Sequence, residues 1–393
     1  MPVDLKKIPG KVPLPDAPDK FRWLIIIALI IIAGATLVLA LWPDEFSTHS
    51  GWFWFCLLAL PISTGLVTYT IRLSLYENER DRVTWWNQLH QKLYQETVLL
   101  GQQAVGVLGM SYITPVASNK LAFAMLQGNS VLETHYSPDF HKILTTASLS
   151  PSLNLMTKSE YQRRLESILI RVIAQLYDEM EQFGGNFFVR IHHEGVLNNE
   201  QILAIWQKIF PATFRVIDIH ISNDSTGLMW IDDWLDKQDD GVVLSVESNL
   251  FLQPCDQQAE SVSALLLASP AWLLRSKVKP NMWIHRPIVI TQADAAVENT
   301  ARWGKLTPEE PWFLWRAQIE KNLLATILQA MYKNNFLSDK KGEIILEDIF
   351  GKPQAALGHI TLICACEHAV TSGQPQWLIL GEEHTQMAIV RPV

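Results

Sequence analysis

The sequence has few cysteines, little excess charge and no glycine-rich phosphate loop, and each shortage excludes a class of protein. Its 393 residues include four cysteines, which do not make a disulfide framework. Lys and Arg number 32 against 40 Asp and Glu, and the net charge of −8 argues against nucleic-acid binding. The nearest approach to a phosphate loop, Gly106-x-x-Gly109, is too short a motif to bind phosphate.

Charge is missing altogether from two apolar runs, Trp23–Trp42 and Trp52–Ile71. A helix of 20 residues spans roughly 30 Å, the thickness of bilayer hydrocarbon. We therefore predict a transmembrane helical hairpin over residues 23–71; the alternative is a pair of buried core helices. Pro61 lies inside the second run and predicts a kink there.

Basic residues flank the hairpin on its outer sides and are absent from the loop Pro43–Gly51. Cytoplasmic flanks carry the excess of Lys and Arg, so we predict two spans with both termini in the cytoplasm. The proline-rich residues 1–22 are expected to form a cytoplasmic tail, and residues 72–103 a juxtamembrane helix.

Residues 104–393 alternate between strand-like and helix-like segments, which predicts a mostly parallel or mixed α/β sheet. The expected helices are 160–182, 199–209, 223–237, 317–332 and 359–371. The expected strands or extended segments are 104–112, 186–191, 214–221, 241–246, 261–268, 285–291, 343–346, 377–381 and 387–390.

No segment has the spacing of a metal site, and we predict neither a metal nor another cofactor. Cys364-x-Cys366-x-His368 has suitable ligand types at an unsuitable spacing, and its cysteines are expected to be small residues on a packed helix. His192-His193-Glu194 lacks the spacing that puts two imidazoles on one helical face, so a solvated loop is expected.

Acidic residues gather between residues 232 and 240. They predict a solvated helix face that could also dock a basic partner. The acidic residues are Asp232, Asp233, Asp236, Asp239 and Asp240.

Three stretches resemble the thiolase-like fold of ketosynthases and thiolases. Asn223–Leu228, followed by a helix and the apolar Gly241–Val246, resembles the ketosynthase nucleophile elbow. Gln258–Leu267 is similar to the family's Gly-Glu-Gly-Ala stretch, and Ala356–His359 to its Gly-His before a small-residue helix. The resemblance implies an α/β/α layered body over residues 104–393, with two halves that meet near 216–260.

On this resemblance the nucleophilic cysteine of the family is replaced by Asp224. A carboxylate is a weak nucleophile and is expected to cap the following helix. Ser225 is a second candidate nucleophile, with His220 or His359 as its base. The family's other histidine has no counterpart near Glu343–Gly351, so Asp224, Ser225 and His359 are interpreted as a vestigial site and no catalytic residue is assigned.

A membrane-anchored, catalytically empty thiolase-like protein resembles the adaptors for type VI secretion lipases. This resemblance implies a non-enzymatic accessory at the bacterial inner membrane that binds a secreted effector or the secretion machinery. The alternatives are an acyl-transferring enzyme with a nucleophile other than cysteine and a membrane-bound protein of assembly or immunity type. Homo-oligomerisation is left open.

Tryptophan is abundant, with 15 residues, and exposed tryptophan often anchors a protein interface. The alternative for each is core packing. The candidates for partner binding are Trp230, Trp234, Trp283, Trp312 and Trp315.

Overall fold

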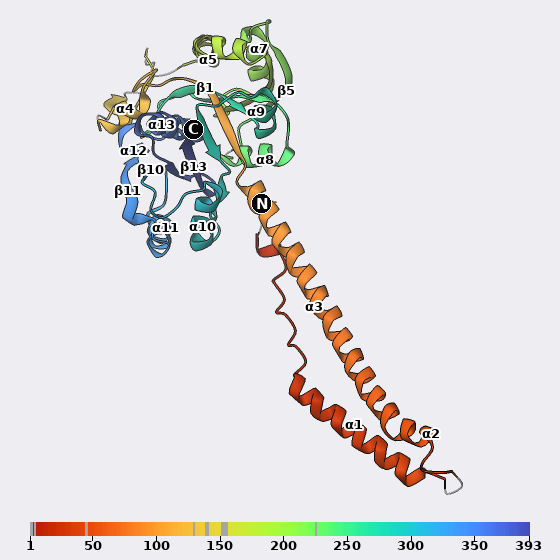
Figure 1. The fold of residues 1–393 in the computed structure, drawn as a ribbon. Coiled ribbons are helices and arrows are strands. Elements are labelled where there is room, and N and C mark those ends of the chain that lie inside the picture. Colours follow the sequence, from red (N-terminus) through yellow and green to blue (C-terminus); the bar gives the residue numbers. More distant parts are fainter. Residues whose placement is uncertain are drawn as a thin grey trace. The chain divides into compact units, whose positions relative to one another are not determined.

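The computed structural model describes residues 3, 5–43, 46–128, 130–137, 141–150, 156–224 and 226–393. The chain divides into two compact units, Met1–Leu99 and Leu100–Val393 (Figure 1). The first unit contains the helical elements η1 (Leu5–Lys7), α1 (Lys20–Leu41), α2 (Gly51–Trp54), η2 (Phe55–Ala59) and most of α3 (Leu60–Gly101).

Two helices of the first unit are long and apolar enough to cross a membrane: α1, and the continuous helix Gly51–Gly101. The predicted hairpin is therefore present as helices. The predicted juxtamembrane helix, however, is not a separate element, because α3 runs from the second apolar run through to Gly101 without a break.

The interruption expected at Pro61 takes the form of a π-helical turn, η2, immediately before α3. The Leu60 N–H bonds to the Phe55 carbonyl, five residues back, and this wider turn leaves room for a ring that cannot donate a hydrogen bond. A Cβ added at Gly34 would lie 2.7 Å from the Pro61 ring. The glycine therefore lets α1 and the proline-containing helix pack closely.

The second unit is built around one mixed sheet. Its strand order is β11-β10-β12-β13-β8-β1-β7-β6-β4-β5, with β9 paired to β13 off this path. The strands are β1 (Ala104–Ile113), β4 (Asn186–His193), β5 (Arg215–Ser222), β6 (Val242–Asn249), β7 (Ser261–Ala268), β8 (Met282–His285), β9 (Ile288–Val289), β10 (Trp312–Ala317), β11 (Lys340–Ile345), β12 (Gln376–Gly381) and β13 (Thr385–Pro392). A separate hairpin joins β2 (Glu133–Ser137) to β3 (Lys142–Thr146).

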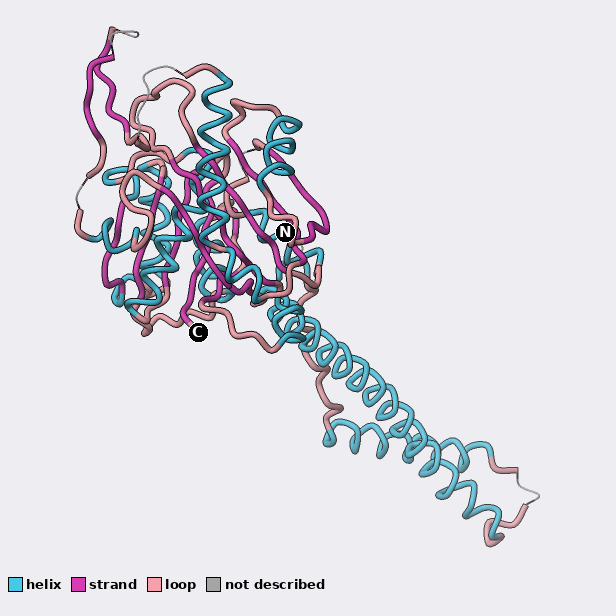
Figure 2. The backbone as a smooth tube through the Cα atoms, turned by 90° about the horizontal axis from the view of Figure 1, so that it is seen from above, coloured by secondary structure: helices cyan, strands magenta, loops and turns pink. Residues whose placement is uncertain are grey.

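Helices connect and cover these strands, as Figure 2 shows. They are α4 (Leu121–Leu126), α5 (Lys158–Gln175), α6 (Tyr177–Gln182), α7 (Asn199–Ile209), α8 (Met229–Lys237), α9 (Pro270–Ser276), α10 (Ala293–Trp303), α11 (Lys321–Lys333), α12 (Leu346–Ile349) and α13 (Leu357–Ser372). Short 3-10 turns are η3 (Leu337–Asp339) and η4 (Gln354–Ala356).

The sheet consists of two halves with the same internal order. In the first half β4 pairs in parallel with β5 and β6, and β7 lies antiparallel between β6 and β1. In the second half β10 pairs in parallel with β11 and β12, and β13 lies antiparallel between β12 and β8. The antiparallel pair β1–β8 joins them. The halves thus meet between Ala268 and Met282, later than the predicted 216–260, and residues 218–268 belong to the first half.

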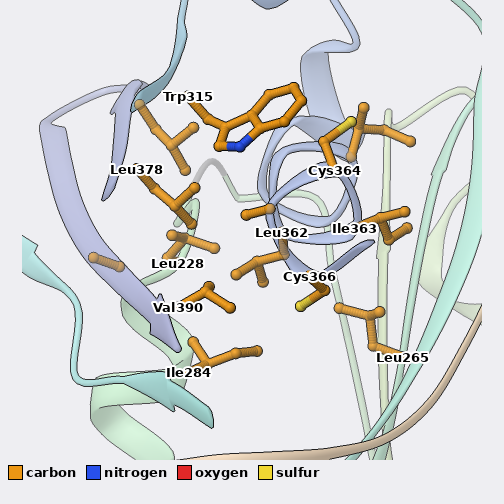
Figure 3. Packing of buried hydrophobic residues seen from close by; sticks show 14 of the residues in the cluster. Leu228, Leu265, Ile284, Trp315, Leu362, Ile363, Cys364, Cys366, Leu378 and Val390 are labelled. Atoms are coloured by element: carbon orange, nitrogen blue, oxygen red, sulfur yellow. The ribbon is translucent and has the colours of Figure 1, made fainter. Parts of the chain in front are cut away.

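Two helices, α8 and α13, lie in the middle of the layers. One buried cluster joins them to the inward faces of both half-sheets, while α5 and α7 pack on the outer face of the first half. Figure 3 shows Leu362, Cys364 and Cys366 of α13 surrounded by side chains that include Trp315 and Leu378. The prediction of small residues on a packed helix is confirmed for both cysteines, which are fully buried.

Some elements differ from the sequence prediction. The segment Trp312–Ala317 forms a strand, β10, which is not among the predicted strands. Helix α10 was also not predicted. The helix expected from Asn223 begins only at Met229, so Asn223–Leu228 is a loop rather than a helix start.

Candidate functional site

A polar cluster lies on the inward face of the first half-sheet. Strand alternation turns Arg190 and His192 of β4 to the same face. On β6, Ser245 and Glu247 point the same way, and His359 of α13 packs against them. All five side chains are buried in an otherwise apolar layer.

The imidazole of His359 has a partner on each nitrogen. Its Nε2 lies 2.9 Å from Ser245 Oγ, and its Nδ1 lies 3.1 Å from Ser263 Oγ. Burial lowers the pKa of His359 to about 4, against the opposing effect of the nearby Glu247 carboxylate. The ring is therefore neutral near pH 7, with exposure to solvent of 0%.

Glu247 links this histidine to the sheet. Its Oε1 accepts a hydrogen bond from Arg190 Nη1 at 2.8 Å, and its Oε2 accepts the backbone N–H of His359 at 3.0 Å. Arg190 also donates to Ser245 at 3.1 Å, and its guanidinium lies 4.6 Å from the ring centre of Trp230. A buried ion pair of this kind holds β4, β6 and the first turn of α13 in register.

Above the cluster a cleft of about 210 Å³ opens at the carboxyl ends of the parallel strands. Glu194, Asn223, Gln318 and Glu382 line it, and each directly follows one strand: β4, β5, β10 and β12 respectively. In open α/β sheets this is where ligands bind. Both halves of the fold therefore contribute to one cleft.

Two residues give the cleft an unusual chemistry. Burial raises the pKa of Glu194 to about 8, although the Ser248 hydroxyl donates to its carboxylate at 3.2 Å. Gln318 has a left-handed φ of 54° and a buried Nε2 with no acceptor in the described part of the chain. Such strain and an unsatisfied donor are features of ligand-binding positions.

The prediction of a solvated loop at His192-His193-Glu194 is wrong. Both histidines belong to β4 and are buried; His192 Nδ1 lies 3.1 Å from the Ser222 carbonyl, and His193 Nε2 2.9 Å from Asn199 Oδ1. The alternation Phe188, Arg190, His192 along the strand was the sequence signal for an inward polar face.

Asp224 is exposed and lies in the loop before α8, where it caps no helix. The N-cap of α8 is Leu228, whose N–H donates to Gln386 Oε1 at 2.7 Å. Asp224 lines a second cavity, of about 240 Å³, which Arg190 also lines. His359 lines neither cavity, so the structure does not place Asp224 and His359 around one reacting point. Ser225 lies outside the described residues.

The five tryptophans proposed as partner contacts have different environments. Trp312 and Trp315 are wrong as surface candidates, because both are fully buried in β10; Trp315 Nε1 donates to Gln376 Oε1 at 2.9 Å. Trp234 is also buried and is therefore wrong as a surface candidate, while Trp230 and Trp283 are partly exposed. Trp230 and Trp234 line the cavity that contains Asp224.

Metal-ligating side chains do not converge in the described residues: no group of three or more His, Cys, Asp or Glu is placed to hold an ion. The thiols of Cys364 and Cys366 are unreactive, because burial raises the pKa of both above the usual value.

Comparison with solved structures identifies the architecture. An oxazolomycin ketosynthase domain of Streptomyces albus superposes with a TM-score of 0.53 at 11% identity, over 74% of this chain and 75% of that domain. The body has the thiolase-like ketosynthase fold. A beta-ketoacyl synthase from Burkholderia phymatum gives 0.50 at 10% identity, over 74% of this chain and all of its own.

A further match is a type II polyketide ketosynthase in complex with its acyl-carrier protein, with a TM-score of 0.51 at 13% identity over 74% of this chain and 99% of that chain. No protein-family model and no curated protein matches the sequence. These proteins are similar to this chain in fold, and the similarity by itself assigns no catalytic residue to this chain.

Proposed function

We propose that this chain is a non-enzymatic, membrane-anchored adaptor that binds another protein. The observation that carries the proposal is the closure of His359. Both of its ring nitrogens and its backbone N–H have protein partners, and its side chain has no exposure to solvent. Acyl transfer requires a nucleophile, its base and oxyanion donors around one accessible point. The enclosed position of His359 supports a ketosynthase scaffold that binds rather than catalyses.

The partner class comes from the resemblance to adaptors for type VI secretion lipases. On this resemblance the partner is a secreted effector or a component of the secretion apparatus, bound at the bacterial inner membrane. Helix α1 and the helix Gly51–Gly101 are the parts of the chain that would hold it there. The basic flanks of the hairpin favour a cytoplasmic body, where an effector waits for export.

Binding is tested with purified components. The full chain, extracted in mild detergent, is titrated with a purified type VI lipase effector that the same genome encodes. A strain from which the gene for this chain is deleted is then assayed for secretion of that effector. The proposal expects saturable binding and loss of secretion that the wild-type gene restores. Absence of binding together with unaltered secretion would rule out the adaptor function.

The orientation is tested with a membrane-impermeant maleimide on intact cells. In a variant without native cysteines, Ser47→Cys in the loop between the helices should react from outside the inner membrane, and Asp178→Cys in the body should react only after permeabilisation. The reverse pattern would place the body outside.

The second candidate is an acyl-transferring enzyme, favoured by the cleft at the strand ends. Glu194, with its raised pKa near 8, is suited to accept or donate a proton near neutral pH. Incubation with acyl thioesters followed by intact-mass measurement tests this reading. An acyl adduct or thioester turnover that Glu194→Gln abolishes would favour the enzyme over the adaptor.

A further inference from the structure

The cavity between α8 and the edge strand β5 has the composition of a binding site rather than of a packing defect. Four carboxylates line it: Asp218, Asp224, Asp233 and Asp239. Within the described part of the chain, none of them has a cationic side chain within ion-pair distance. The other acidic residues predicted to form a solvated face behave differently.

Asp232 is buried and forms an ion pair with Arg286. The exposed Asp236 also pairs with Arg286, at 2.6 Å, and Asp240 pairs with Arg275 at 2.5 Å. The acidic segment is thus divided in two. One part neutralises arginines of the fold, and the other part, Asp233 and Asp239, turns toward the cavity. Lys237 and Arg190 also line this cavity, but Arg190 pairs with Glu247, and no ion pair joins Lys237 to an aspartate among the described residues.

Three hydrogen-bond donors along the same cavity lack acceptors in the described residues. They are Nη2 of Arg190 and the indole Nε1 atoms of Trp230 and Trp234. Arg190 is 6% exposed and Trp234 is 8% exposed, so bulk water does not satisfy these groups as it would at the surface. Buried donors of this kind are uncommon in native proteins and point to a ligand that brings acceptor oxygens.

Beside the cavity the sheet has a free edge. Strand β5 pairs with β4 on one side, and among the described residues nothing pairs with its other side. Its exposed positions include Asp218, His220 and Ile217, which is 52% exposed. An uncovered eight-residue edge is a template for pairing with another extended chain.

We infer that β5 and the cavity under α8 form a docking site for an extended, basic peptide segment of a partner protein. The segment pairs its backbone with β5. Its Lys or Arg side chains meet the carboxylates, and its carbonyl oxygens accept from Arg190 and the indoles. This ligand class satisfies both the unpaired negative charge and the unsatisfied donors, whereas a simple anion would be repelled by the four aspartates. The inference rests on the proposed protein-binding function and specifies the chemistry of the partner.

The experiment uses the full chain in detergent micelles and three fluorescein-labelled peptides as probes: (Lys-Thr)5, (Glu-Thr)5 and (Lys-Pro)5. The third keeps the charge of the first, but its prolines cannot donate backbone hydrogen bonds to a strand. Fluorescence anisotropy is expected to show binding of (Lys-Thr)5, at least fivefold weaker binding of (Lys-Pro)5, and none of (Glu-Thr)5.

Two charge-matched variants locate the site. Asp233→Asn/Asp239→Asn should weaken (Lys-Thr)5 binding at least fivefold. Asp178→Asn/Glu181→Gln, which removes two exposed carboxylates from α6, should leave it within twofold. Equal losses in both variants, or binding of (Glu-Thr)5 as tight as that of (Lys-Thr)5, would overturn the site.

A second copy of the chain is the rival occupant of the β5 edge. Sedimentation of the detergent-solubilised chain should then show a dimer that Ile217→Lys dissociates, and this result would overturn the peptide site. The effector titration separates the two proposals. Unaltered effector binding by the Asp233→Asn/Asp239→Asn variant would rule out this site and leave the adaptor function standing. A wild-type chain that binds basic peptide but no effector would support the peptide site and rule out the adaptor function.

Discussion

Glu247 accepts the backbone N–H of His359 at 3.0 Å, across 112 positions of the chain. The same carboxylate binds Arg190, so one side chain ties β4, β6 and the start of α13 together. This places the histidine that most resembles a catalytic residue inside a structural network.

Glu247→Gln removes the charge that compensates Arg190 in the buried layer. We expect the free energy of unfolding to fall by about 3–5 kcal/mol, the range for breaking a buried ion pair. Urea unfolding of the detergent-solubilised chain, followed by near-ultraviolet circular dichroism, measures the change. The matched control is Glu298→Gln, which breaks the exposed pair with Arg302 and should cost less than about 1 kcal/mol. Similar costs for both variants would contradict the structural role.

Glu194 makes the stability of the fold decrease as pH rises from about 4.5 to about 8. Its folded-state pKa of about 8 lies above the usual 4.5, so its contribution is complete below pH 4.5 and is lost as pH rises through about 8. Glu194→Gln should flatten this part of the stability profile, measured by urea unfolding at pH 5, 7 and 9. The control Glu181→Gln, at an exposed position, should keep the wild-type slope. An unchanged slope in Glu194→Gln would show that the pKa of the Glu194 carboxyl is not raised.

His359 affects how the stability of the fold changes at acid pH. Its pKa is lowered from 6.5 to about 4, so its contribution is present above pH 6.5 and is lost as pH falls through about 4. His359→Gln, whose amide can still bond to Ser245 and Ser263, should reduce the loss of unfolding free energy between pH 6.5 and 4. The exposed His220→Gln serves as the control. A slope in His359→Gln equal to that of wild type would count against a buried neutral imidazole.

Gly34→Leu tests the helical hairpin. The added side chain meets the Pro61 ring, which a Cβ would already approach to 2.7 Å, so α1 must shift. We expect a thermal midpoint several degrees lower in detergent, measured by near-ultraviolet circular dichroism of the indoles in this unit. Gly51→Ala, where nothing lies within 4 Å of the added Cβ, should leave the midpoint unchanged. Equal midpoints in the two variants would show that the helices are not in close contact.

The sequence alone determined the elements whose signal is local. The charge-free runs become α1 and the helix from Gly51, and the spacing of Leu165, Ile168 and Val172 becomes the buried face of α5. The limits of α7 and β7 follow from their caps and apolar patterns. Such features depend on the period of a helix or strand, which neighbouring residues are enough to reveal.

Tertiary structure alone decided the environment of each candidate residue. Trp312 and Trp315 lie in β10, which pairs with β11 and β12 and is buried between layers of the fold, whereas Trp230 lies on α8 and is partly exposed. The loop before α8 leaves Asp224 exposed, while the central helix layer encloses His359. Access to solvent and the identity of hydrogen-bond partners come from contacts between residues far apart in the sequence, and no local pattern encodes them.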